Sequence, residues 1–269
     1  MTPGGIQMTE KTPRLRDRTA LVTGASQGLG AGIARELAAQ GAKVLVCSRS
    51  EENLRAMVGA NPGDWWIEWE AADVTDPEAA PRLAEIARAR FGRLDILVCN
   101  AAGPPPCDFA DASDAQWQAA FELILLGPIR LIRACLPLLR LGGGGHILLC
   151  GSISALRPVP HLLLSNTLRP GLAGLARHLA IELAEDNVLV NAIAPGFFDT
   201  ERSREVLAAA AQRRGLPLEE VAAANTARVP LRRQGDPREL GKLVAFLVSP
   251  ENSYLTGRTL VIDGGMLLT

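Results

Sequence analysis

The sequence has little of what marks several classes of protein. Its net charge is only −1, so no overall field draws it to nucleic acid or to an anionic membrane. Residues 123–141 are rich in leucine, but they also contain arginines, a glycine and prolines, which argues against a membrane span. Residues 1–18 are polar and lack the apolar core of a signal peptide. We therefore expect a cytoplasmic protein with neither a nucleic-acid nor a membrane partner.

Cysteine and histidine occur, but not in the spacings that bind metals. The five cysteines are odd in number and include no C-x-x-C pair, and the three histidines have no metal-ligand spacing. Several of the cysteines lie in apolar stretches. We expect buried free thiols in a reducing compartment and no metal site. The cysteines are Cys47, Cys99, Cys107, Cys135 and Cys150.

Lysine and tyrosine are the scarcest of the residues that matter for catalysis. Only three of the 28 basic residues are lysine, and the rest are arginine. An arginine in this chain is therefore weak evidence that arginine was needed at that position. The only tyrosine is Tyr254, close to the C-terminus.

What the chain does have is a regular alternation of short apolar runs and helical patterns. Nearly all-apolar strands followed by amphipathic helices are typical of parallel β-α-β units with helices on both faces. We predict the α/β class: a single doubly wound Rossmann domain over 18–269, with a seven-stranded, mainly parallel sheet in a three-layer α-β-α arrangement, after a flexible lead-in at 1–17. The predicted strands are 19–23, 43–47, 65–71, 96–99, 146–150, 188–193 and 259–262, and the predicted helices are 30–40, 77–91, 114–141, 163–184, 217–227 and 237–248.

A glycine-rich turn follows the first predicted strand and opens the next helix. Glycines allow a tight turn that brings backbone N–H groups against a pyrophosphate, and the helix N-terminus adds positive potential. The alternative is a tight turn without a ligand. The candidate cofactor-binding residues here are Thr23, Gly24, Ser26, Gln27, Gly28, Leu29 and Gly30.

The end of the second predicted strand indicates which dinucleotide binds. Residues 47–49 contain no carboxylate to accept a hydrogen bond from a ribose 2′-hydroxyl, whereas Ser48 and Arg49 suit a 2′-phosphate. We therefore predict NADP(H) rather than NAD(H). The alternative for Arg49 is a solvated loop arginine.

Asp73 and Val74 follow the third predicted strand, at the same edge of the sheet. There an aspartate can accept a hydrogen bond from the adenine amino group. The alternative is a helix N-cap next to Pro77, and both roles are compatible.

At this point the sequence resembles the short-chain dehydrogenase/reductase superfamily, from about residue 19 to residue 265. The family pattern T-G-x-x-x-G-x-G is complete at 23–30, and its N-N-A-G appears as Cys99-Asn100-Ala101-Ala102. Residues 190–196, with 199–200 after them, match the stretch that contacts the nicotinamide side, and 254–257 and 263–265 match the closing motif. The resemblance implies further cofactor contacts at Asn100, Ala101, Ala102, Pro195, Gly196, Phe198 and Thr200.

The same resemblance implies a changed catalytic set. Ser152 takes the place of the family serine, with Ser154 as the alternative register and turn capping as the alternative role. The family's Y-x-x-x-K reads Ser165…Arg169, and Ile124 aligns with the family's water-holding asparagine. Replacing a phenol of pKa about 10 by a serine removes general acid catalysis that typically contributes about 10²–10⁴-fold. Arg169 keeps the ability to bind ribose hydroxyls but stays protonated, so it relays no proton.

We therefore expect an NADP(H)-dependent oxidoreductase that transfers hydride to a ketone or a conjugated C=C substrate, with non-standard proton delivery. Ser152, Ser165 and Arg169 are the candidate catalytic residues. Two alternatives stay open: a catalytically silent NADP(H)-binding sensor, scaffold or partner subunit, and a structural subunit that binds nothing.

The remaining expectations concern the surroundings of the site and the assembly. His161 is a candidate acid or an ordinary loop histidine, and with Phe197, Phe198 and Leu207 it is a candidate lining of an apolar pocket, the alternative for each being ordinary packing. Pro170 is expected to kink its helix near the site. Residues 200–226 resemble the family's variable substrate-capping helices. The resemblance also implies a homo-tetramer or homo-dimer through helices 114–141 and 163–184.

Overall fold

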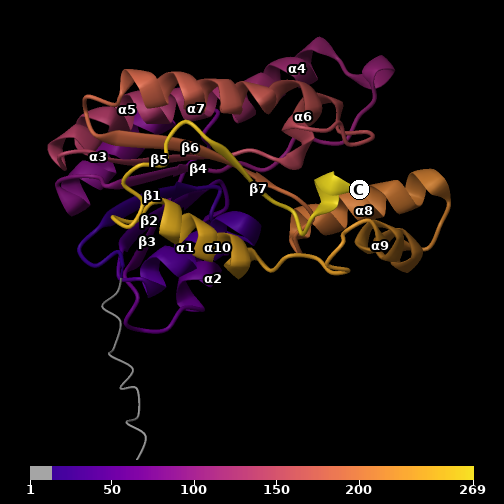
Figure 1. Cartoon of the computed structure of the whole chain (residues 1–269), viewed down its shortest axis with the longest axis horizontal. Coiled ribbons are helices and arrows are strands. Elements are labelled where there is room, and N and C mark those ends of the chain that lie inside the picture. The colour runs from indigo at the N-terminus through magenta and orange to yellow at the C-terminus, as the bar shows by residue number, and fades with distance from the viewer. Residues whose placement is uncertain (1–13) are drawn as a thin grey trace, which may run out of the picture.

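The computed structural model describes residues 14–269 and has one seven-stranded sheet at its centre (Figure 1). The strand order is β3-β2-β1-β4-β5-β6-β7, and every neighbouring pair is parallel. This confirms the predicted doubly wound fold, because the order reverses between β1 and β4. The strands are β1 Thr19–Thr23, β2 Lys43–Ser48, β3 Ile67–Ala71, β4 Ile96–Cys99, β5 Gly145–Cys150, β6 Val188–Pro195 and β7 Thr259–Ile262.

Helices cover both faces of the sheet, as Figure 1 shows. On one face α1 (Gly28–Ala39), α2 (Glu51–Gly59) and α10 (Pro237–Leu247) bury residues such as Ile33, Leu54 and Leu240 against the strands. On the other, α3 (Ala79–Phe91), α5 (Gly127–Leu141) and α7 (Pro170–Glu182) enclose a second core around Leu83 and Leu131. The central strands β1 and β4 are buried on both sides because each side faces a core, whereas the edge strand β3 is only partly buried and carries Glu68 and Glu70.

Both of the long helices predicted from the sequence are interrupted. The predicted helix 114–141 consists of α4 (Asp114–Phe121), a π-helical turn (Glu122–Leu126) and α5. The predicted helix 163–184 consists of α6 (Leu163–Leu168) and α7, with Arg169 at the break. Pro170 explains the second interruption, since it has no N–H to continue the ladder and occupies the first turn of α7.

Two helices were not predicted with bounds of their own. α2 is short and mostly polar, and only Leu54 and Met57 of its side chains are buried, so its apolar pattern is weak. The second unpredicted helix is α8 (Glu201–Arg214). It lies beside α9 (Leu218–Ala227), which corresponds to the predicted helix 217–227, and both lie beyond the carboxyl end of the sheet, at the right of Figure 1. They form a small layer of their own around Leu207 and Val221.

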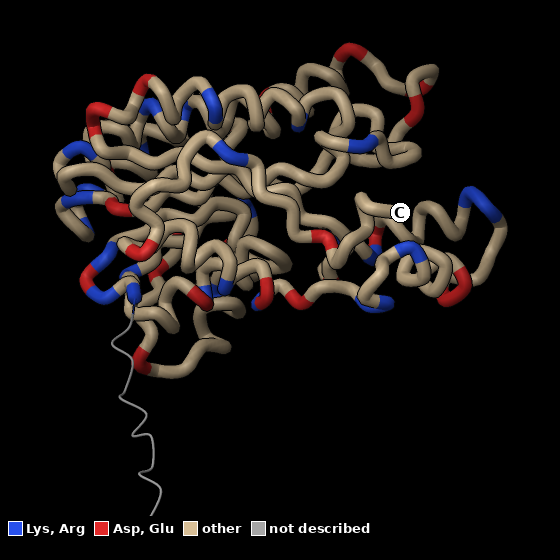
Figure 2. The backbone as a smooth tube through the Cα atoms, viewed as in Figure 1, with Lys and Arg blue, Asp and Glu red and all other residues tan. Residues whose placement is uncertain are grey.

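The lead-in predicted at 1–17 falls mostly outside the described residues. Within it, however, Leu15 is fully buried and its N–H donates to the Gln40 carbonyl at 2.9 Å. The packed domain therefore reaches at least as far as Leu15. No helix among residues 14–269 is long and apolar enough to cross a membrane. Figure 2 shows basic and acidic residues mixed along the backbone in this view, with neither sign gathered on one side.

Candidate functional site

The turn after β1 is held by the residue that follows β4. The Asn100 side-chain amide donates to the carbonyls of Thr23 at 3.2 Å and Gly24 at 3.0 Å. The Thr23 hydroxyl donates to the Asn100 carbonyl at 2.8 Å and accepts from the Asn100 N–H at 3.0 Å. Asn100 therefore shapes the glycine turn from behind, at the point where the strand order reverses, and its amide is used within the protein.

The glycine turn has the geometry of an anion-binding loop. Gly24 and Gly28 both have φ of +58°, in the left-handed region that favours glycine. A Cβ on Gly30 would lie 2.3 Å from the Gly24 carbonyl oxygen, so α1 and the turn meet closely. The N-cap residue of α1, Gln27, makes no side-chain cap hydrogen bond. The first backbone N–H groups of α1 are thus left for a ligand.

Ser48 and Arg49, which are expected to select the dinucleotide, lie at the same edge of the sheet as the glycine turn. Ser48 ends β2, and Arg49 is exposed and makes no ion pair or hydrogen bond with residues 14–269 through its guanidinium.

Asp73 accepts from the Thr75 N–H at 2.9 Å and from the Thr75 hydroxyl at 2.7 Å. The alternative that Asp73 caps the next helix is wrong, because α3 begins at Ala79.

The segment after β6 comes back over the glycine turn. Thr200 caps α8, its hydroxyl accepting from the Ser203 N–H at 3.1 Å, and a Cβ on Gly28 would touch the Thr200 side chain at 3.5 Å. The structure thus brings the predicted residues 195–200 to the predicted residues 23–30. The Phe198 ring turns inward and is buried against Gly235, so only the backbone of Phe198 is left to contact a cofactor.

Three serines gather beyond the end of β5. The Ser152 hydroxyl accepts from the Ser154 N–H at 3.1 Å, so Ser152 does form the turn expected as its alternative role. The Ser154 hydroxyl is buried without a hydrogen-bond partner. Ser165 lies on α6, which packs against the 153–155 turn. Ser165 is 5 % exposed, and its hydroxyl has no hydrogen-bond partner among residues 14–269.

Arg169 lies between α6 and α7 with its side chain directed at the end of β5. One of its terminal nitrogens, Nη1, donates to the carbonyls of Cys150 at 3.1 Å and Gly151 at 2.9 Å, which places the guanidinium beside Ser152. Burial lowers the pKa of Arg169 to about 10, an effect that Cys150 opposes and the charge of Arg202 reinforces. Arg169 therefore remains a cation at neutral pH.

Comparison with known proteins shows to which protein family this chain belongs. The family model described as enoyl-(acyl carrier protein) reductase matches residues 24–267. The chain is 34 % identical over 258 residues to the dehydrogenase/reductase SDR family member 4 of Sus scrofa, covering 95 % of this chain and 89 % of that protein. This chain belongs to the short-chain dehydrogenase/reductase family. The resemblance seen in the sequence is thereby confirmed at the level of the family.

Two further relatives place the chain among reductases of this family. It is 35 % identical over 254 residues to the 3-oxoacyl-[acyl-carrier-protein] reductase FabG of Escherichia coli (strain K12), covering 93 % of this chain and 98 % of that protein. The crystal structure of L-sorbose reductase from Gluconobacter frateurii, complexed with NADPH and L-sorbose, superposes with a TM-score of 0.88 at 30 % identity, covering 95 % of this chain and 98 % of that one. The chain thus has the sequence and fold of reductases of the short-chain dehydrogenase/reductase family.

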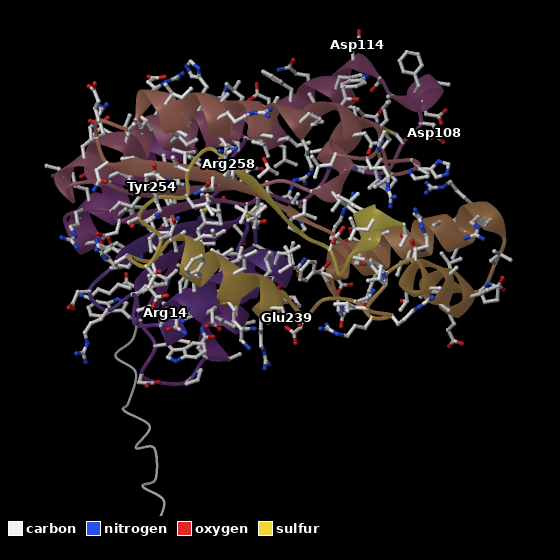
Figure 3. The ribbon with its side chains drawn as sticks, viewed as in Figure 1. Arg14, Asp108, Asp114, Glu239, Tyr254 and Arg258 are labelled. Carbon is white, nitrogen blue, oxygen red and sulfur yellow. The ribbon has the colours of Figure 1, made fainter. Side chains whose placement is uncertain are left out.

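The single tyrosine of this family member lies away from the gathered serines. Tyr254 is 97 % exposed, and Figure 3 shows it on the side of the molecule away from α8 and α9. Ile124 is 2 % exposed within the π-helical turn and contributes only apolar surface there. Neither residue supplies a proton donor next to Ser152 and Ser165.

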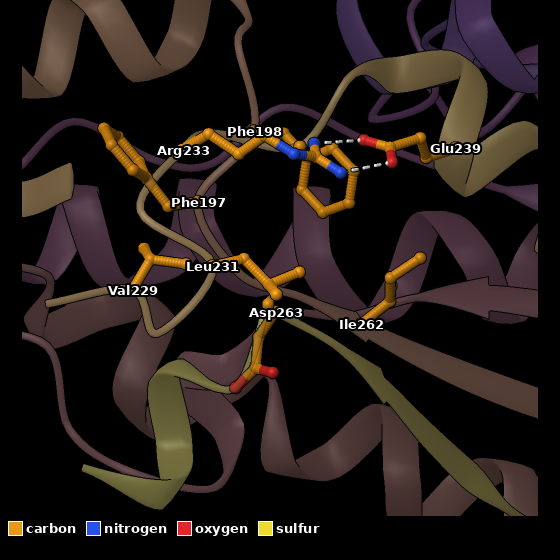
Figure 4. Close-up of a pocket in the computed structure, with 10 residues that line it drawn as sticks. Phe197, Phe198, Val229, Leu231, Arg233, Glu239, Ile262 and Asp263 are labelled. Atoms are coloured by element: carbon orange, nitrogen blue, oxygen red, sulfur yellow. Dashed lines mark hydrogen bonds and ion pairs between the residues drawn. The ribbon is translucent and has the colours of Figure 1, made fainter. Parts of the chain in front are cut away.

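The four residues considered as the lining of an apolar pocket lie in different surroundings. Phe197 and Phe198 line a cavity of about 90 Å³, together with Val229, Leu231 and the Arg233–Glu239 ion pair (Figure 4). Leu207 instead packs between α8 and α9.

His161 lies in a separate hollow of about 260 Å³, where its Nδ1 lies 2.8 Å from Asp108 Oδ2. His161 therefore does not share a cavity with Phe197 and Phe198, and for Leu207 the alternative of ordinary packing is the one observed. Sequence analysis also missed Arg202, at the start of α8, since nothing local to it indicates a role.

Proposed function

We propose that this protein is an NADP(H)-dependent reductase that delivers hydride to a small carbonyl compound or a conjugated C=C bond, without a tyrosine acid. The observation that carries the proposal is the intact glycine turn, held by Asn100 at the point where the strand order reverses. Relatives with the same fold are described as reductases in complex with NADPH, and the matching family is named for reduction of enoyl groups. We also propose that Ser165 and Arg169 occupy the family's tyrosine and lysine positions, and that the protein forms a homo-dimer or homo-tetramer.

The residues present fit NADP(H). The free N–H groups of the turn and of α1 would hold the pyrophosphate, Arg49 the 2′-phosphate, and the segment around Thr200 the nicotinamide side. The cofactor, when bound, supplies the hydride. We keep Asp73 and Val74 as the proposed adenine contacts.

The chain's own contribution is to receive the charge that develops on the substrate oxygen. We assign to Ser152 and Ser165 the donation of hydrogen bonds to this oxygen, and to the Arg169 cation the stabilisation of its negative charge. The Arg169 guanidinium bonds to the Gly151 carbonyl, next to Ser152, and Ser165 lies on the preceding helix α6. None of these groups releases a proton readily at neutral pH. A conjugated C=C substrate suits this set, because its charge comes to rest on an enolate oxygen and protonation from water can follow.

The test is NADPH oxidation against a panel of ketones, quinones and conjugated enones, with NADPH binding measured in parallel. We expect turnover on a member of the panel that falls by about 100–1,000-fold in Ser152→Ala or Ser165→Ala, in line with the loss of one preorganised donor. Ser253→Ala, on an exposed bend, is the matched control and should leave turnover unchanged. Turnover that is equal in all four proteins would contradict the proposed roles.

Cofactor choice is tested separately at Arg49. Losing one charge-assisted contact should weaken NADPH binding in Arg49→Gln by about tenfold or more, while NADH binding stays unchanged. Arg258→Gln removes another exposed arginine and serves as the control. If Arg49→Gln and Arg258→Gln bind NADPH with equal affinity, the 2′-phosphate is bound elsewhere or not at all.

The second candidate is a silent NADP(H)-binding member of the family. The exposure of Tyr254 to solvent and the apolar Ile124 in the π-helical turn favour this function. Tight NADPH binding without turnover on any substrate of the panel is the result that would move the assignment to this function.

A further inference from the structure

Two arginine side chains converge on one glycine beside the gathered serines. A Cβ on Gly103, in the loop after β4, would lie 3.4 Å from Nε and Nη2 of Arg202 and 3.7 Å from Nη2 of Arg169. Arg169 comes from the break between α6 and α7, and Arg202 from the first turn of α8. Three segments remote in sequence thus place two guanidinium groups around a position that carries no side chain.

These two charges are poorly compensated within the protein. Arg169 is 8 % exposed and bonds only to the Cys150 and Gly151 carbonyls through Nη1, with no carboxylate partner among residues 14–269. Arg202 donates to the Pro104 carbonyl, and its one carboxylate partner, Glu205, is exposed and three residues along the same helix. Two guanidinium groups are thus paired with one carboxylate among residues 14–269, so the site keeps an excess of positive charge.

A buried guanidinium with free N–H groups and a second guanidinium beside it is suited to an anion. Arginine forms bidentate pairs with planar carboxylates, and desolvation strengthens such pairs. The mutual effect is visible in Arg169, whose pKa falls through burial and, in addition, through the charge of Arg202, with Cys150 opposing. An anion between the two guanidinium groups would offset both the burial of the Arg169 charge and its repulsion by Arg202.

We propose that Arg169 and Arg202 bind a carboxylate of the substrate, so that the preferred substrates are short 2-oxo acids or their unsaturated relatives. The inference rests on the proposed reductase function and names its substrate class. The guanidinium of Arg169 bonds to the carbonyl of Gly151, the residue before Ser152, so the anion and the reacting oxygen lie close together. Arg202 lies two residues after Thr200, whose side chain borders Gly28 of the glycine turn. The cofactor pyrophosphate is therefore the competing anion, and the experiment below separates it from a substrate carboxylate.

The probe is oxamate, an unreactive analogue of a 2-oxo acid, titrated calorimetrically into the full chain with and without NADP⁺. We expect oxamate to bind, the neutral methyl ester of oxamic acid to bind at least about tenfold more weakly, and Arg202→Gln to lose at least about tenfold in oxamate affinity. Arg202→Lys should recover part of that loss. Arg204→Gln changes an exposed arginine two residues along the same helix and should bind oxamate like the wild type.

Three results would overturn the inference: equal affinity for oxamate and its neutral ester, an unchanged oxamate affinity in Arg202→Gln, or a loss of NADPH affinity in that variant without a loss of oxamate affinity. The last would assign the arginine pair to the cofactor phosphates. Oxamate binding needs no turnover, so the titration is independent of the NADPH oxidation assay. A protein that binds oxamate through Arg202 but oxidises no NADPH would uphold the anion site and refute the reductase.

Discussion

Replacing Gly30 by alanine separates two opposite expectations for the glycine turn. On helix propensity alone, Gly30→Ala in the first turn of α1 should stabilise the protein by about 0.5–1 kcal/mol. The structure predicts the reverse. The new Cβ would lie 2.3 Å from the Gly24 carbonyl oxygen, 2.7 Å from the Asn100 amide nitrogen and 2.9 Å from the Ala25 Cα. Two of these three neighbours are backbone atoms, so the turn itself must move.

The magnitude follows from the contacts that the movement breaks. Overpacking of this kind costs about 1–3 kcal/mol, and losing the Asn100 hydrogen bond to the Gly24 carbonyl adds about 1 kcal/mol. After subtracting the propensity gain, we expect Gly30→Ala to lower the free energy of unfolding by about 1–3 kcal/mol. A chain of this size would then lose roughly 2–10 °C in melting temperature. Displacement of the turn should also abolish measurable NADPH binding.

Urea denaturation followed by circular dichroism, together with NADPH fluorescence titration, measures both effects. Gly59→Ala is the matched control, because Gly59 also lies in a helix but has no atom within 4 Å of its added Cβ. That variant should be as stable as the wild type or slightly more so, with unchanged NADPH affinity. A Gly30→Ala protein that is stabilised and binds NADPH normally would refute the packing argument.

Three other substitutions probe the scaffold. Asn100→Ala leaves two carbonyls of the glycine turn without their donor, so the free energy of unfolding should fall by about 1–3 kcal/mol in urea titrations and NADPH affinity should fall with it. Burial lowers the pKa of His146 from 6.5 to about 4, so the unfolded state takes up the proton first as the pH falls. Stability from this residue is present above the unfolded pKa, and about 2 kcal/mol of the free energy of unfolding should be lost between pH 7.5 and pH 5. This loss should be absent in His146→Gln. It should be the same as in the wild type in His178→Gln, which changes an exposed histidine and is the control. An equal acid loss in wild type and His146→Gln would contradict this. Asp95 is 1 % exposed, accepts from the Thr19 N–H and pairs with Arg18, at the edge of the sheet opposite to the glycine turn. Asp95→Asn should therefore lower the free energy of unfolding by about 2 kcal/mol in urea denaturation without changing NADPH affinity.

The sheet was predictable from the sequence because a strand buried on both faces is an apolar run bounded by polar or glycine residues. The runs at 19–23, 96–99 and 259–262 coincide with β1, β4 and β7. The helix breaks were less predictable. A π-helical turn at 122–126 and a break at Arg169 leave the apolar pattern nearly continuous, so periodicity shows one helix where the backbone forms two.

The candidate site likewise has a part that was predictable from the sequence and a part that was not. The turn from Thr23 to Gly30 is a local motif, and its conformation depends on glycines that are adjacent in the chain. The inward turn of Phe198 against Gly235 and the separation of His161 from Phe197 depend on contacts between remote segments. No pattern within either segment encodes those contacts.

The sequence by itself determined the parallel three-layer fold, the glycine-rich turn after β1 and the scarcity of tyrosine and lysine. These properties reside in residue identity and short-range spacing, which set burial and turn geometry directly. Only the tertiary structure decided that Leu15 belongs to the core, that Asn100 shapes the turn from behind, and that Arg169 and Arg202 face each other across Gly103. The last two relations arise where crossovers bring the ends of β4, β5 and β6 to one edge of the sheet, and the lengths and packing of those crossovers set which side chains meet there. The burial of Leu15 depends on its contact with the residue that follows α1.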